Sequence, residues 1–153
     1  MADLIGGLEA WSVAEFLRRS VWAYPLVNWL HIIAIGFLIT SAILMDLRIL
    51  GLGRGIDASV VVRHLRPVAA IALVVAIAAG FLLFAVKAAD YARNPVFLTK
   101  MGLLALAILN AALFTSFRAH RDRHSAGARA MAAFSILLWL SVALAGRLIA
   151  YVE

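Results

Sequence analysis

The chain has 153 residues, of which 65% are hydrophobic and only 14% are charged, and its mean hydropathy is +1.01. So much apolar surface exceeds what a soluble core can bury, and the composition excludes an ordinary soluble domain. Cysteine is absent, which excludes disulfides and thiolate metal ligands. The formal charge of +6 is divided among short segments and forms no basic domain, so nucleic-acid binding is also excluded.

Residues 1–20 differ from the rest of the chain, because apolar and charged residues alternate there with a helical period. Leu4, Leu8 and Trp11 share one stripe, while Asp3, Glu9, Arg18 and Arg19 supply a polar side. This pattern predicts an amphipathic helix lying at the membrane surface. The alternative is an extension of the first spanning helix, with a bend at Pro25.

Four apolar stretches follow, each close to the ~20 residues that a helix needs to cross the bilayer. They cover about 24–45, 67–86, 96–117 and 130–149. A membrane strand would alternate polar and apolar residues, and these stretches do not. The sequence therefore predicts one all-α domain over 1–153, an integral membrane four-helix bundle with an N-terminal interfacial helix.

The distribution of basic residues predicts the orientation of the bundle. The connections after the first and third spans carry eight arginines, whereas six basic residues, diluted by acids, lie on the other side. This bias places both termini outside. We expect a multi-pass protein of a bacterial inner membrane with periplasmic termini, in contact with lipid and with other membrane subunits or further copies of itself.

Polar residues within spans are the first candidates for function, because they are costly in a membrane. His31 lies seven residues beyond Tyr24, about 10 Å below the outer interface. A deep imidazole there fits a ligand of haem iron, or a structural histidine that hydrogen-bonds within the bundle. Counting inward places no second histidine at this depth, so the other axial ligand would be Met101 or a residue of a partner, or the iron would be five-coordinate.

Other candidates have simpler alternative explanations. Asn110 falls in the same expected layer and could hydrogen-bond to His31, and Lys100 opens the third span but could extend to the headgroups. Asp46 and Arg48 close the first span, where anchoring explains them. His120 and His124 have the i, i+4 spacing of a metal or propionate site, although their setting is also typical of a basic membrane-edge loop. Gly80 is expected to serve close helix packing.

Two segments carry a family resemblance: WAYPLVNWLHIIAIGFLITSAILMDLRILGLG (Trp22–Gly53) and NPVFLTKMGLLALAILNAALF (Asn94–Phe114). Here the chain resembles an uncharacterised bacterial family of small four-helix membrane proteins. It is more distantly similar to membrane-type protoporphyrinogen oxidases and copper-resistance D membrane proteins, some of which are associated with b-type haem. His31, Arg48 and Lys100 look like the histidine, arginine and lysine of the oxidase pattern, but Asn110 and Ala111 stand where that pattern has a further histidine.

These observations lead to three hypotheses of function. The first is a small membrane redox or anchor component that binds haem b through His31, with inner-face arginines such as Arg48 at the propionates, and passes electrons to a partner. The second is a non-catalytic accessory subunit of a larger membrane complex, and the third is transport of a small solute or metal ion. Soluble-enzyme motifs are absent from the sequence, which excludes a soluble catalytic domain but not a membrane enzyme. We expect a protein that is not itself an enzyme.

Overall fold

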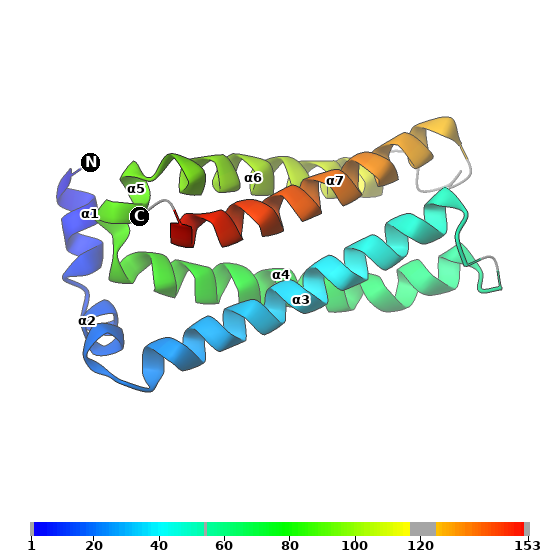
Figure 1. Ribbon diagram of the computed structural model, residues 1–153. Helices are drawn as coiled ribbons and strands as arrows, with labels where there is room; N and C mark the ends of the chain where they lie inside the picture. Colours follow the sequence, from blue (N-terminus) through cyan, green and yellow to red (C-terminus); the bar gives the residue numbers. More distant parts are fainter. Residues whose placement is uncertain (1, 54, 117–124, 152–153) are drawn as a thin grey trace.

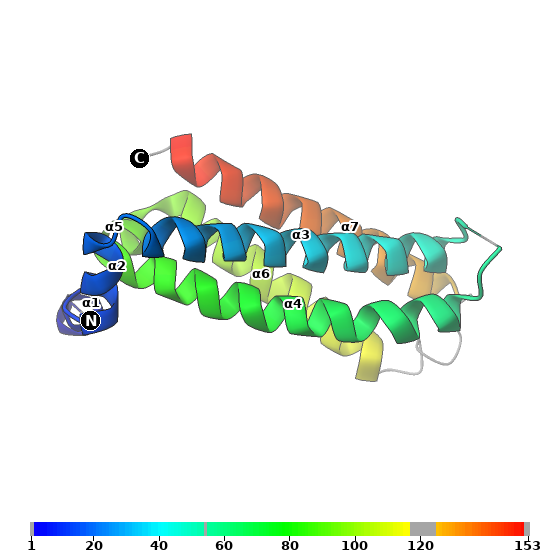
Figure 2. The same cartoon turned by 90° about the horizontal axis from the view of Figure 1, so that it is seen from below.

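A computed structural model describes residues 2–53, 55–116 and 125–151 of the chain. Four long helices form its body: α3 (Ala23–Leu50), α4 (Ala58–Val86), α6 (Pro95–Ser116) and α7 (Ala126–Leu148). Each is long and apolar enough to cross a membrane. They run side by side along one axis (Figures 1 and 2). The prediction of an all-α, four-helix membrane bundle is confirmed.

Shorter elements gather at one end of the bundle. The helices α1 (Ala2–Glu9) and α2 (Ser12–Arg19) lie across this end, α5 (Ala88–Arg93) connects α4 to α6, and the 3-10 turn η2 (Ile149–Tyr151) follows α7 (Figure 1). We call this the terminal end, and the opposite end, which holds the α3–α4 connection and Ser125, the loop end. The single helix expected over 1–20 is therefore two helices, and α2 stops at Arg19 instead of continuing into α3.

The long helices begin and end at residues that satisfy their free backbone groups. Asn94 Oδ1 accepts hydrogen bonds from the amides of Val96 and Phe97 at the start of α6, and Asp57 and Ser125 cap α4 and α7 in the same way. Gly51 ends α3 in the left-handed conformation. Because of these caps, α3 and α4 extend beyond the apolar spans at the loop end, and α4 continues through Pro67.

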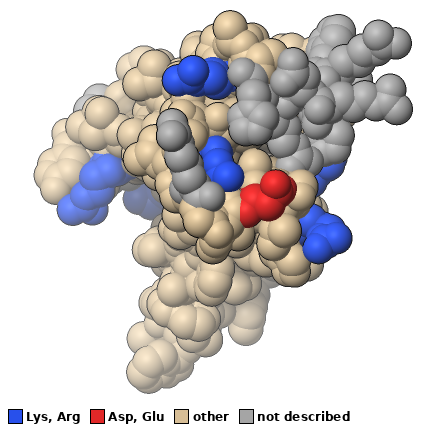
Figure 3. Space-filling model, turned by 90° about the vertical axis from the view of Figure 1, so that its right-hand side faces the viewer, with Lys and Arg blue, Asp and Glu red and all other residues tan. Residues whose placement is uncertain are grey.

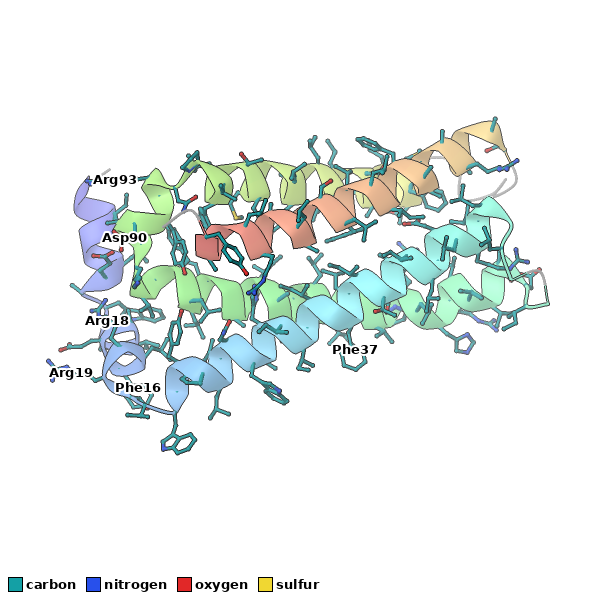
Figure 4. The ribbon with its side chains drawn as sticks, viewed as in Figure 1. Phe16, Arg18, Arg19, Phe37, Asp90 and Arg93 are labelled. Carbon is teal, nitrogen blue, oxygen red and sulfur yellow. The ribbon has the colours of Figure 1, made fainter. Side chains whose placement is uncertain are left out.

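The interior is built mainly from alanine, and large apolar residues face outward. Helices α3, α4, α6 and α7 meet around a cluster formed by Leu38, Ala42, Ala72, Ala107, Leu138 and Trp139. In each of the four long helices, at most 39% of the apolar stretch that could cross the membrane is buried inside the molecule. Phe37, for example, points away from the bundle (Figure 4). Small residues allow close packing while leucine and phenylalanine remain available to lipid, as a membrane bundle requires.

The described surface of the loop end carries mainly basic side chains among its charged groups. Figure 3 shows this end face-on, and more of its surface is blue than red. The basic side chains include Arg63, Arg66 and Arg129, all exposed. The segments α1 and η2, which lead from the N-terminus and to the C-terminus, both lie at the terminal end (Figure 1). This arrangement agrees with an even number of spans and places both termini on one side of the bundle.

Helices α1 and α2 are attached to the terminal end by an arrangement that we call the terminal clasp, formed by Glu9, Arg18, Val86 and Ala89. Arg18 donates one hydrogen bond to the Val86 carbonyl at the end of α4 (3.0 Å) and another to the Glu9 carbonyl (2.5 Å). The Glu9 carboxylate accepts from the Ala89 amide in α5 (2.9 Å). A cation thus lies at a helix C-terminus and an anion at a helix N-terminus, as the helix dipole favours.

Replacing Arg18 tests the terminal clasp. We expect Arg18→Met to lower the protection of the backbone amides of residues 2–19 against hydrogen exchange by about 1.5 kcal/mol, or roughly tenfold in exchange rate. The reason is that hydrogen bonds from a charged donor to two carbonyls are lost. Hydrogen exchange read by mass spectrometry measures this in the purified protein. Arg19→Met is the matched control, since Arg19 points outward and pairs only with Glu15 one turn away (Figure 4). Equal protection in the two variants would contradict the account.

Candidate functional site

His31 lies in the terminal half of α3, where its ring is set against α4. Its Nδ1 lies 2.8 Å from the carbonyl oxygen of Ala76, and the side chain is half-buried. The sequence singled out this imidazole but did not indicate its partner, which is the backbone of the neighbouring helix. The contact fits the alternative expected from the sequence, a histidine that hydrogen-bonds within the bundle. It occupies only Nδ1, however, and leaves the second ring nitrogen available.

This hydrogen bond determines which nitrogen carries the proton. A carbonyl oxygen can only accept, so Nδ1 must be the donor, and in the neutral ring Nε2 then bears a lone pair. Histidines that bind metals commonly donate the other ring N–H to a backbone carbonyl or a carboxylate, which fixes the ring and makes it a better ligand. The arrangement is therefore compatible with coordination through Nε2.

Gly80 makes the close approach of the His31 ring possible. A methyl group placed on Gly80 would lie 2.9 Å from His31 Cε1, closer than real side-chain contacts, and 3.4 Å from Nδ1. The sequence led us to expect close helix packing at Gly80, and the side chain that packs there is His31. Gly80 therefore both lets α3 and α4 approach closely and makes room for the imidazole.

Lys100 provides a second polar group in the terminal half. It is half-buried on α6, and a methyl group on Gly146 of α7 would lie 3.5 Å from its Cε and Nζ. Its charge is near enough to act on the His31 ring. Its ammonium makes no hydrogen bond or ion pair with any other described residue. A cation with no counter-ion among the described residues of an apolar bundle favours an anionic ligand nearby.

The other predicted site residues lie elsewhere. Asn110 is buried, but its amide donates to the Met131 carbonyl on α7 (3.3 Å), about 15 Å along α6 from Lys100. Arg48 donates from Nε to the Ile56 carbonyl in the α3–α4 connection (2.5 Å), about 25 Å along α3 from His31. Of the four candidate cofactor contacts, only His31 and Lys100 come together.

The remaining histidines form no described cluster. His64 is exposed at the loop end, and its Nδ1 contacts the Val60 carbonyl of its own helix (2.8 Å). His120 and His124, the candidate metal pair, lie outside the described residues. Within 2–53, 55–116 and 125–151, no three histidine, aspartate or glutamate side chains come close enough to hold a metal ion.

One polar contact between helices was not expected from the sequence. Asp46 does not simply close the first span, because α3 continues to Leu50 and turns the carboxyl toward α7. There it meets the hydroxyl of Ser135, a buried residue. The sequence did show an acidic residue, Asp46, within a helical stretch that ends at Gly51. It gave no indication of which helix the carboxyl would face.

Comparison with known proteins gives one match. A family of unknown function, DUF6644, matches residues 20–152, which include all four long helices. The chain belongs to this family. The match agrees with the predicted resemblance to an uncharacterised family, and the whole of α1 and α2 lies before the matched range. No curated protein and no solved structure matches the chain.

Substituting Gly80 tests the contact with His31. We expect Gly80→Ala to lower the stability of the bundle by about 1–3 kcal/mol, because the added methyl group overlaps the imidazole. Thermal unfolding in detergent measures the change. Gly102→Ala on α6 is the control: it meets no atom within 4 Å and should gain up to ~1 kcal/mol of helix propensity. If both variants unfold at the same temperature, the His31 ring does not lie on Gly80.

Proposed function

We propose that the protein is a small membrane redox or anchor component in which His31 holds haem b and from which electrons pass to a partner. The observation that carries the proposal is the hydrogen bond from His31 Nδ1 to the Ala76 carbonyl, which leaves Nε2 as a fixed ligand nitrogen. Bound haem would supply one-electron chemistry, and the chain would hold and orient it.

Lys100 adds support because haem carries two propionates. A half-buried ammonium with no described counter-ion, near His31, is suited to pair with one of them. Arg48 and Asn110 lie too far along their helices to join this site, so the proposal now rests on His31 and Lys100. A second axial ligand would come from Met101, the exposed neighbour of Lys100, or from another subunit or copy.

The distant resemblance to protoporphyrinogen oxidases and copper-resistance D proteins that we expect from the sequence, at His31 and Lys100, would also fit this function. We place the protein in a bacterial inner membrane with both termini on the periplasmic side. The support is the arginine-rich loop end, which the positive-inside rule assigns to the cytoplasm.

Optical spectroscopy tests the proposal. Purified in detergent with haem supplied, the protein should give Soret and alpha bands in a reduced-minus-oxidised spectrum. His31→Ala should abolish them, because the iron loses its ligand. His64→Ala is the matched control and should keep them, since His64 is exposed and also contacts a backbone carbonyl. Bands that persist in His31→Ala would contradict the proposal.

An accessory subunit of a larger membrane complex is the second candidate. It is favoured by the small extent of the described segments outside the four long helices. In that case His31→Ala would lower assembly or stability without removing any optical signal. A wild-type protein that shows no bands with haem supplied, and that co-purifies with other membrane subunits, would favour this function over the first.

A further inference from the structure

Asp46 is a polar group that the proposed haem site does not use. It lies on α3 four residues before the helix ends at Leu50, about 6 Å along the axis from the loop end. Its carboxyl faces the Ser135 hydroxyl on α7. The Oδ2 atom is buried and has no hydrogen-bond partner, the one such side-chain atom among the described residues.

A charged carboxylate is expensive in this position. Asp46 is half-buried as a residue, but a charged oxygen buried without a hydrogen bond is strongly unfavourable, and the unbonded Oδ2 leaves half of the carboxylate uncompensated. Either a cation or a proton must therefore balance the charge.

The basic groups that the structure describes on the surrounding helices do not supply that cation. Those at the loop end of α3, α4 and α7 are Arg48, Arg63, His64, Arg66 and Arg129. Arg48 donates to the Ile56 carbonyl, and the other four are exposed. None of them forms an ion pair with Asp46 in the described chain.

Ser135 is suited to a carboxyl that changes its protonation. A hydroxyl can donate to a carboxylate oxygen and can equally accept from a carboxylic acid, so it remains a partner in both states. A lysine or arginine at this position would fix the carboxylate in its charged form. The serine allows either form without rearranging α7.

We propose that Asp46 is a proton-binding site, a carboxyl that rests in its protonated form and exchanges its proton with the loop end of the bundle. The ligand is a proton and not a metal ion, because the described residues offer only one carboxyl and one hydroxyl at this point. The site lies on α3 about 22 Å from His31, and the inference does not depend on whether haem is bound.

Carbodiimide labelling tests the proposal on the intact protein in detergent. Dicyclohexylcarbodiimide reacts with protonated carboxyls in apolar surroundings, so it should modify Asp46 at neutral pH, as read by mass spectrometry of the peptides. Labelling should fall as the pH is raised. Asp46→Asn should lose the adduct, whereas Asp90→Asn, an exposed carboxyl on α5, should keep it.

Two results would overturn the proposal. Absence of an adduct at Asp46 would mean that the carboxyl is not protonated, and protection by sodium or potassium ions would make it a cation site. If Asp46→Asn does not fold, infrared spectroscopy of the wild type and of Ser135→Ala gives an independent test. The wild type should show the C=O stretch of a carboxylic acid, and loss of the Ser135 hydroxyl should shift its frequency. A wild type without this band would also contradict the proposal.

Discussion

The hydrogen bond between the His31 ring and the Ala76 carbonyl fixes how α3 and α4 can pack. A donor inside a membrane must find an acceptor within the protein, and here the acceptor is on another helix. The ring can reach it only because Gly80 has no side chain. Once α3 is held in this register, its later residues are also placed, and Asp46 faces Ser135 on α7.

The same helix thus carries a polar group toward each end, with an alanine-rich interior between them. His31 and Lys100 lie in the terminal half, which α1 and α2 cover from the end of the bundle (Figure 1). Asp46 lies in the loop half, near the arginine-rich surface of Figure 3. If both proposals hold, an electron-carrying group and a proton-binding group are separated along one helix.

The sequence predicted the helices well and singled out His31, because an uninterrupted apolar run defines a span and a polar residue within it is conspicuous. It placed Asn110 in the His31 layer by counting inward from a common interface. That count ignores how helices cross and shift, and in the structure Asn110 bonds to Met131 instead. The interhelix partners Ala76 and Ser135 could not be predicted, because one chain's sequence contains no direct signal for the register between helices. Helix α5 was missed because six residues give too short a pattern to read.

The central claim is that the Nε2 atom of His31 binds haem iron, and imidazole rescue tests it most directly. In His31→Gly the ligand is removed and a space is left beside Gly80 that free imidazole can enter. The account predicts that the reduced-minus-oxidised bands disappear in this variant and return when imidazole is added. Bands that are unchanged in His31→Gly without imidazole, or absent from the wild type with haem supplied, would contradict it.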